Sequence, residues 1–200
     1  MKKKIKVHLR EESYFIYTGY PLKDIGRLFN KRYGRKILVL SDNRVFPLYG
    51  KVVKDSIIEA GKEVIEVIVP PGERQKSLGS AFNILKKCAE NNMNRDDTIL
   101  TLGGGVISDL GGFVASIYMR GINFVPVPTT LLAQVDAAIG GKTGVNLPFG
   151  KNLVGSFYQP SFVYMDYSTL STLPEREMKQ GLAEIIKYGI IKSKKIFFIV

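Results

Sequence analysis

The chain has 200 residues, 45% of them apolar, and a formal net charge of +11, which suits one domain, or one domain and the start of a second. Its longest apolar runs are too short to cross a membrane, and its single cysteine and single histidine exclude an internal disulfide and restrict any transition-metal site. The charge suits phosphorylated partners or a solvated lysine-rich surface, and the scattered lysines make a nucleic-acid partner unexpected. The single cysteine fits a reducing cytoplasm, and we expect no membrane partner.

Strands and helices are expected to alternate along the chain. The first half predicts strands at 5–9 and 14–17, a short helix at 21–33, a buried strand at 36–40, a helix at 45–60 and a strand at 64–69. An amphipathic helix follows at 77–91, on which Leu78, Phe82, Leu85 and either Cys88 or Ala89 share a face. The second half predicts strands at 98–102, 124–127 and 162–165, and helices at 106–119, 129–139 and from Pro174 onward.

This alternation predicts an α/β fold with a Rossmann-like, doubly wound, mainly parallel sheet. We expect that domain to cover residues 1–172 and the start of an α-helical domain to cover 173–200. The final segment, 195–200, is almost entirely apolar, which is an unusual end for a finished domain. We therefore expect the rest of the helical domain to be absent from this chain.

The strongest functional signal lies in the glycine-rich stretch 103–155. A predicted strand runs into Gly103, Gly104 and Gly105 and then into a helix, an arrangement that lets backbone amides approach an anion. The Rossmann fingerprint fits only in part, because Ser108 occupies the third glycine position and no acid follows the next strand. A tight turn without a ligand is the alternative.

The segment 140–143, Gly-Gly-Lys-Thr, does not form a P-loop. That motif requires a glycine where Asp136 stands, and the preceding residues are predicted to be helical. A lysine in a glycine-rich turn still suits a phosphate oxygen, which applies to Lys142 and to Lys151. The threonines at 129–130 lie at a strand-to-helix corner, where they face the same site or act as ordinary helix caps.

Two other segments follow strands in the first half of the chain. In the polar turn 71–76, Glu73 is able to accept from a ribose hydroxyl and Lys76 to reach a phosphate. Capping of the next helix explains this turn equally well. Asp42 follows the strand at 36–40 and is well placed for a ribose diol.

Charged residues at two helices are weaker candidates. Glu184 and Lys187 are neighbours on one helix face, where a surface ion pair is the simpler interpretation. Gly181, one turn earlier, weakens the helix unless a close approach is needed, which favours a site. Arg120 at a helix end suits phosphate or carboxylate, or only the helix dipole.

Taken together, these segments resemble the 3-dehydroquinate synthases of the sugar-phosphate cyclase family. The resemblance covers nearly the whole chain, and Ser108 stands where the family usually has glycine. The matching pieces are PGERQK at 71–76, GGGVISD at 103–109, YMRG at 118–121, PTTLLAQVDAAIGGKTGVN at 128–146, GKNLVGSFYQP at 150–160, LPERE at 173–177 and GLAEIIKYG at 181–189.

The resemblance implies a homodimeric lyase that uses NAD and a divalent metal, zinc or cobalt. Its substrate would be a phosphorylated sugar acid, 3-deoxy-D-arabino-heptulosonate 7-phosphate, which is cyclised to 3-dehydroquinate with release of phosphate. NAD would accept a hydride transiently and return it. A related cyclase, a metal-dependent polyol dehydrogenase and a module that only binds NAD are the alternatives.

The resemblance also implies roles for individual residues. Glu184 would be a metal ligand, and Arg120 would reach the substrate phosphate of a neighbouring subunit. The family's two histidine ligands lie beyond the equivalent of Val200, so this chain is expected to be an N-terminal portion that is inactive alone. Substrate contacts would be Asp136, Lys142, Asn152 and Lys187. Cofactor contacts would be Asp42, Pro71, Gly72, Glu73, Arg74, Gln75, Lys76, Gly104, Gly105, Val106, Ile107, Ser108, Asp109, Thr129, Thr130, Lys142, Lys151, Thr169, Leu170, Ser171 and Thr172.

Overall fold

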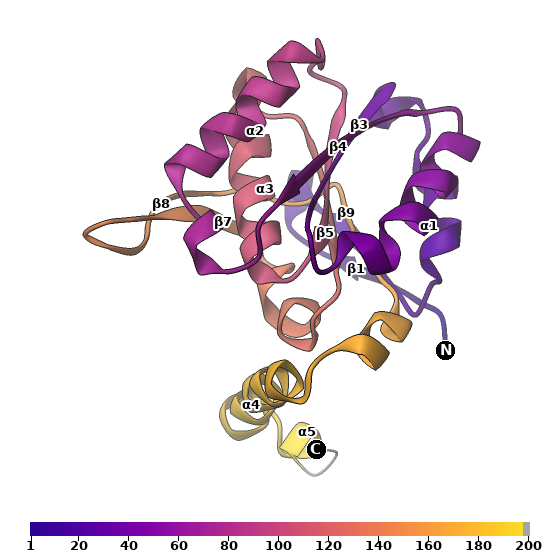
Figure 1. Cartoon of the computed structure of the whole chain (residues 1–200). Helices are drawn as coiled ribbons and strands as arrows, with labels where there is room; N and C mark the ends of the chain where they lie inside the picture. Colours follow the sequence, from indigo (N-terminus) through magenta and orange to yellow (C-terminus); the bar gives the residue numbers. More distant parts are fainter. Residues whose placement is uncertain (198–200) are drawn as a thin grey trace.

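A parallel four-stranded sheet forms the centre of the molecule in the computed structural model, which describes residues 1–197 (Figure 1). Its strand order is β4–β3–β5–β6. The strands are β3 (Lys36–Asp42), β4 (Glu63–Val69), β5 (Thr98–Gly103) and β6 (Asn123–Pro128). All neighbouring pairs run parallel. The predicted α/β class with a parallel sheet is therefore confirmed.

Helices cover both faces of this sheet. On one face lie α1 (Phe46–Glu59) and the 3₁₀ segment η2 (Leu22–Leu28), and on the other lie α2 (Leu78–Glu90) and α3 (Gly105–Ile117). Alternate residues of β3 serve the two faces: Ile37 and Val39 pack with α1, while Leu38 and Leu40 pack with α2 and α3. All four side chains are fully buried, as expected for a strand covered on both sides.

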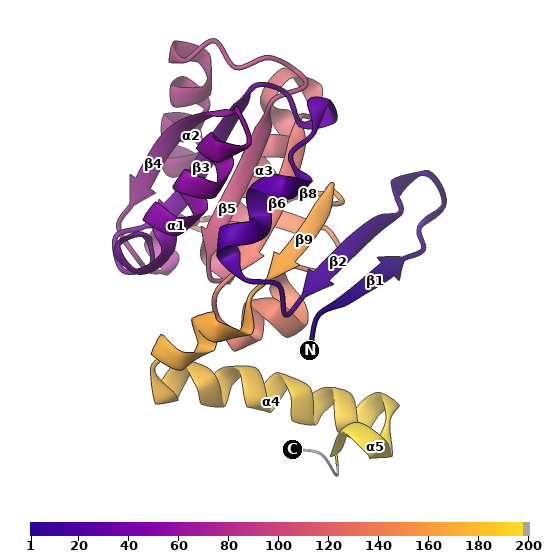
Figure 2. The same ribbon diagram turned by 90° about the vertical axis from the view of Figure 1, so that its right-hand side faces the viewer.

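A second, three-stranded sheet lies beside β6 (Figure 2). The strand β1 (Lys3–Val7) pairs antiparallel with β2 (Tyr14–Thr18), and β2 pairs parallel with β9 (Phe162–Met165). The N–H of Ser161 donates to the carbonyl of Phe124 over 2.8 Å and ties the start of β9 to β6. This sheet carries the short helix η7 (Tyr167–Thr172) to the carboxyl edge of the central sheet.

A β-hairpin was not expected from the sequence. Its strands, β7 (Lys142–Leu147) and β8 (Gly150–Phe157), are antiparallel and project from the body of the molecule (Figure 1). The region was predicted to be a glycine-rich turn. Gly144 and Gly155 face each other across the hairpin, and Thr143 Oγ1 donates to the Ser156 carbonyl over 3.0 Å.

Two predicted helices have a different form. The helix expected at 21–33 consists of the 3₁₀ segments η2 and η3 (Lys31–Tyr33). Within η2, Gly26 lies close against α1 and donates its N–H to Ser56 Oγ over 3.0 Å. The helix expected at 129–139 contains the π-helical segment η6 (Ala133–Ala137). The remaining short 3₁₀ segments are η1 (Arg10–Glu12), η4 (Glu73–Gln75) and η5 (Tyr118–Arg120).

The predicted buried face of α2 is wrong in part. Leu78 and Phe82 are 48% and 66% exposed, whereas Ala81, Ile84 and Cys88 are buried. The stripe 81–84–88 faces α3 in the core, so tertiary packing selected one of two interleaved apolar stripes. Cys88 is a core residue, as expected, and its burial raises the pKa of its thiol to about 12.

The chain then leaves the α/β body through a long helix, α4 (Glu175–Lys192), followed by α5 (Lys194–Phe197). Figure 2 shows α4 lying across the end of the body. Pro174 is the residue that precedes the helix rather than its first residue. A separate helical domain from residue 173 stays a prediction, and residues 198–200 of the apolar run lie outside the described residues. Within 1–197, no helix has the length and apolar character needed to span a bilayer.

Candidate functional site

The carboxyl ends of the four central strands open into a cavity of about 560 Å³, which we call the strand-end cavity. Crevices at this edge of open parallel sheets are the usual place for ligands. Each strand end contributes to the lining, and η7 and the start of α4 close the other side. The lining residues that the sequence predicted are Asp42, Pro71, Gly72, Glu73, Lys76, Gly104, Gly105, Val106, Ile107, Asp109, Thr129, Thr130, Thr169 and Thr172.

The N-terminus of α3 faces the strand-end cavity. Gly104 precedes the helix without a side-chain cap, so the first amides of α3 are available to a ligand. A Cβ at Gly104 would lie 3.1 Å from Thr130 Cγ2, and one at Gly105 would lie 3.2 Å from Ala137 Cβ. The glycines therefore keep the backbone close to its neighbours and open to the cavity. A helix end of this kind, with its positive dipole, suits an anion such as a pyrophosphate.

The departure at Ser108 lies outside the cavity. Its side chain is 2% exposed, and Ser108 Oγ has no hydrogen-bond partner in the part of the chain that is described. Its N–H donates to the Gly104 carbonyl over 3.1 Å within the first turn of α3. The serine therefore leaves the helix start intact, and its predicted cofactor contact is not among the cavity-lining groups.

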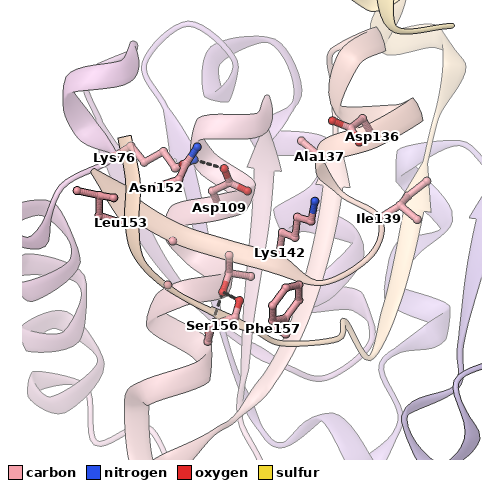
Figure 3. A pocket seen from close by; sticks show the side chains of 13 residues that line it. Lys76, Asp109, Asp136, Ala137, Ile139, Lys142, Asn152, Leu153, Ser156 and Phe157 are labelled. Carbon is pink, nitrogen blue, oxygen red and sulfur yellow. Dashed lines mark hydrogen bonds and ion pairs between the residues drawn. The ribbon is translucent and has the colours of Figure 1, made fainter. Parts of the chain in front are cut away.

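A second cavity, of about 600 Å³, lies between the β7–β8 hairpin, α3 and η6 (Figure 3). We call it the hairpin cavity. Asp136, Lys142 and Asn152, the residues expected to contact the substrate, all line it, and the contact itself stays a prediction. Figure 3 shows Lys142 directed toward the space between Asp109 and Asp136. The hairpin thus presents a cation to two carboxylates, and the cavity offers both charge signs to a polar ligand.

Lys76 and Asp109 form an ion pair in the wall that the two cavities share. Lys76 is 7% exposed, so its buried positive charge must be compensated by the carboxylate of Asp109. Burial raises the pKa of Asp109, and the hydrogen bond and charge of Lys76 act against that rise. The two cavities therefore adjoin each other at this pair and at Ala137, which also lines both.

Glu73 is held by the hairpin. Asn146 Nδ2 donates to Glu73 Oε1 over 2.7 Å, and the exposed Lys151 has its Nζ 3.8 Å from the same oxygen. The helix cap of α2 is Ser77, whose hydroxyl accepts from the Ser80 N–H. The capping alternative for Glu73 therefore does not apply. Thr130, in contrast, does act as a cap, because its hydroxyl accepts from an amide in the following turn.

Side chains from the middle of α4 approach η6 and lie outside both cavity linings. Glu184 pairs with Lys187, whose hydrogen bond lowers the pKa of the Glu184 carboxyl. The hydroxyl of Tyr188 donates to Asp136 Oδ1 over 3.0 Å. No sequence pattern selects Tyr188 beyond its place next to Lys187. The contact links the helix carrying Glu184 to a residue of the hairpin cavity.

Gly181 explains how α4 comes this close. A Cβ there would lie 2.5 Å from Leu131 Cγ and 2.8 Å from the backbone nitrogen of Leu132. The expected close approach is therefore present.

Within residues 1–197, no three His, Cys, Asp or Glu side chains are grouped so that they could hold a metal, so Glu184 alone is a partial site.

Several predicted residues lie outside both cavity linings. Arg120 lies at the far end of α3 from the cavity, roughly 20 Å away for a helix of this length. Its expected contact with a neighbouring subunit stays a prediction. The others outside the linings are Arg74, Gln75, Ser108, Lys151, Leu170, Ser171, Glu184 and Lys187. Residues that line the strand-end cavity without having been predicted include Arg44, Leu48, Tyr49, Glu177 and Gln180.

Comparison with known proteins identifies the family. A family model described as 3-dehydroquinate synthase N-terminal matches residues 66–180. The chain belongs to the 3-dehydroquinate synthase family. The 3-dehydroquinate synthase of Pelotomaculum thermopropionicum is 48% identical over 195 residues, which are 96% of this chain and 53% of the relative. The chain thus spans about half the length of the curated relatives it matches.

Solved structures of two related cyclases share the fold. A 2-deoxy-scyllo-inosose synthase in complex with carbaglucose-6-phosphate, NAD⁺ and Co²⁺ has a TM-score of 0.89 at 28% identity, covering 94% of this chain and 52% of that one. The 2-epi-5-epi-valiolone synthase of Streptomyces hygroscopicus, with NAD⁺ and Zn²⁺ bound, has a TM-score of 0.85 at 30% identity, with the same coverage of 94% and 52%. The structural similarity to these cyclases therefore agrees with the family assignment.

Proposed function

We propose that this chain provides the cofactor site and part of the substrate site of a 3-dehydroquinate synthase. That enzyme cyclises 3-deoxy-D-arabino-heptulosonate 7-phosphate to 3-dehydroquinate and releases phosphate, as a phosphorus–oxygen lyase of the shikimate pathway. The meeting of two cavities at Lys76 and Asp109 is the observation that carries the proposal. A hydride passes only between groups in contact, so the reaction needs two ligands side by side at such a wall.

The strand-end cavity fits NAD. Gly104 and Gly105 form a cradle that a Cβ would fill, and the free amides of α3 suit the pyrophosphate. Asp42 would accept from a ribose hydroxyl, and Thr129 and the threonines of η7 line the same space. NAD⁺ is present in both related cyclase structures. When bound, NAD supplies a hydride acceptor that later returns the hydride.

The hairpin cavity would take the phosphorylated sugar acid. Lys142 offers a point charge to a phosphate or carboxylate oxygen, and Asn152 is able to donate and accept at a hydroxyl. Asp136 would accept from a substrate hydroxyl. Arg120 would act in a neighbouring subunit, which makes the active enzyme a homodimer. The net charge of +11 suits an anionic substrate and cofactor.

The residues of this chain fit the divalent metal only in part. Glu184 would supply one carboxylate ligand, and the remaining ligands would come from elsewhere in the enzyme, since residues 1–197 hold no grouped set of three. Lys187 would contact the substrate from the same helix face. A cytoplasmic location agrees with the single, buried cysteine.

The reaction separates this proposal from a polyol dehydrogenase on the same scaffold. The complete enzyme containing this chain, with the heptulosonate phosphate, NAD⁺ and Zn²⁺, should release one phosphate per 3-dehydroquinate formed and accumulate no NADH. Glu184→Ala should lose metal-dependent turnover, while Lys192→Ala at the exposed end of α4 should retain it. Net NADH without phosphate release would contradict the proposal.

A related sugar-phosphate cyclase is the second candidate, favoured by the TM-score of 0.89 to 2-deoxy-scyllo-inosose synthase. Supplying glucose 6-phosphate in place of the heptulosonate phosphate distinguishes the two enzymes. Cyclisation of the hexose phosphate alone would favour this candidate. NAD binding without turnover of either sugar by the complete enzyme would favour a module that only binds the cofactor.

A further inference from the structure

The strand-end cavity has two chemically different ends. One end meets the hairpin cavity at Lys76, Asp109 and Ala137. If the proposed function holds, the reactive nicotinamide must lie at that end, beside the substrate. The adenosine part must then lie at the other end, on the α1 side of the sheet, where Asp42 and Arg44 line the cavity.

Asp42 has only one carboxylate oxygen available at that end. Its Oδ1 already accepts from the N–H of Arg44 over 2.8 Å and from the N–H of Val45 over 3.0 Å. The residue is 9% exposed, so its position at the start of α1 is fixed. The second oxygen suits a ribose diol, and the negative charge disfavours a phosphate on the same ribose.

Arg44 contributes a positive charge at the same end of the cavity. It is exposed and lines the same end of the cavity, and no carboxylate pairs with it among the described residues. Lys76, the other cation of the lining, is already engaged by Asp109. A guanidinium group is the side chain that best matches a phosphate, through a fork of N–H donors.

We propose that Arg44 is a specificity-determining residue for the 2′ position of the adenosine ribose. Asp42 selects the 2′-hydroxyl of NAD, and Arg44 forms a latent site for the 2′-phosphate of NADP. The charge of Asp42, which is buried and fixed, outweighs that of the exposed Arg44 in the unchanged chain. When the charge of Asp42 is removed, Arg44 should therefore increase the affinity for the 2′-phosphate of NADP.

Calorimetric titration of the full chain with NAD⁺ and with NADP⁺ tests this proposal. Asp42→Asn is the informative variant, because the amide oxygen still accepts from the two N–H groups at the start of α1 while the charge is lost. The set is completed by Arg44→Ala, by the double variant and by Arg95→Ala as a control. Arg95 is also exposed but lies at the amino end of the strands, away from this cavity.

The unchanged chain should bind NAD⁺ at least tenfold more tightly than NADP⁺. Asp42→Asn should raise NADP⁺ affinity about tenfold, and adding Arg44→Ala should abolish that gain while changing NAD⁺ affinity less than threefold. If Arg44→Ala lowered the affinities for NAD⁺ and NADP⁺ equally, Arg44 would be assigned to the pyrophosphate and the proposal would be overturned. So would a gain in Asp42→Asn that survives the loss of Arg44. A folded chain that binds neither cofactor would contradict the proposed function itself, and the role of Arg44 with it.

Discussion

The hydroxyl of Tyr188 on α4 donates to Asp136 Oδ1 on η6 over 3.0 Å, which joins two elements 52 residues apart. Burial, and then this hydrogen bond, raise the pKa of Tyr188, which favours the protonated hydroxyl that donates to Asp136. Together with Gly181, the contact fixes α4 against the π-helical segment.

Tyr188→Phe should loosen this junction. The loss of one exposed hydrogen bond should destabilise the chain by about 0.5–1.5 kcal/mol, or lower the melting temperature by roughly 1–6 °C. Hydrogen exchange should increase in α4 and remain unchanged in the central sheet. Tyr20→Phe is the matched control, because the Tyr20 hydroxyl has no hydrogen-bond partner within residues 1–197. Equal effects of the two variants would contradict the role of Tyr188.

Gly181→Ala and Gly79→Ala should act in opposite directions. Both glycines lie in helices, where alanine is favoured by about 0.5–1 kcal/mol. At Gly79 the new Cβ meets nothing closer than Ser77 Oγ at 3.9 Å, so that variant should be stabilised. At Gly181 it meets Leu131 and the backbone of Leu132, so α4 must move and stability should fall. Urea denaturation measures both, and stabilisation by Gly181→Ala would show that α4 does not pack this closely.

Removing one partner of the Lys76–Asp109 pair should cost more stability than removing both charges. Lys76→Met leaves the Asp109 carboxylate buried without its cation, which should destabilise the chain by about 3–5 kcal/mol. The double variant Lys76→Met/Asp109→Asn should be more stable than Lys76→Met, because no charge is then left in the wall. Urea denaturation of the set at pH 7 measures this difference. A double variant less stable than Lys76→Met would contradict it.

The pH dependence of the Lys76→Met variant follows from the direction of the Asp109 shift. Burial raises the Asp109 pKa and Lys76 lowers it, so loss of Lys76 should raise the pKa further. An acid with a raised pKa in the folded state binds its proton more tightly there. Its contribution to stability is present below the unfolded pKa and is lost as pH rises through the folded pKa. Lys76→Met should therefore lose stability between about pH 4 and the raised pKa. Carbon NMR of the Asp109 carboxyl gives the titration directly, and a pKa that falls in the variant would contradict this reasoning.

The central sheet could be predicted because β3, β5 and β6 are buried on both faces and the edge strand β4 is mostly apolar. Runs such as 36–40 and 98–102 admit few other structures, and the turns after them carry Asp42 and the glycines at 103–105. The α2 face could not be predicted, since the stripes through Phe82 and Ile84 are both apolar and only contact with α3 decides between them.

The site was predictable as a set of residues and not as a geometry. Lys76 and Asp109 were both expected to contact the cofactor, but their mutual ion pair depends on how α3 packs beside η4. The hairpin escaped prediction because its strands are rich in glycine and lack a regular apolar alternation. Arg44 was missed because no pattern marks an exposed arginine at a helix start as part of a cavity.

A crystal structure of this chain with NAD⁺ measures most directly whether the strand-end cavity holds the cofactor with its reactive end beside the hairpin cavity. The pyrophosphate should lie against the amides of Gly105 to Ile107, the adenosine ribose against Asp42, and the nicotinamide at the wall formed by Lys76 and Asp109. A nicotinamide ring at the Asp42 end, or NAD⁺ bound away from the strand-end cavity, would contradict the proposed arrangement.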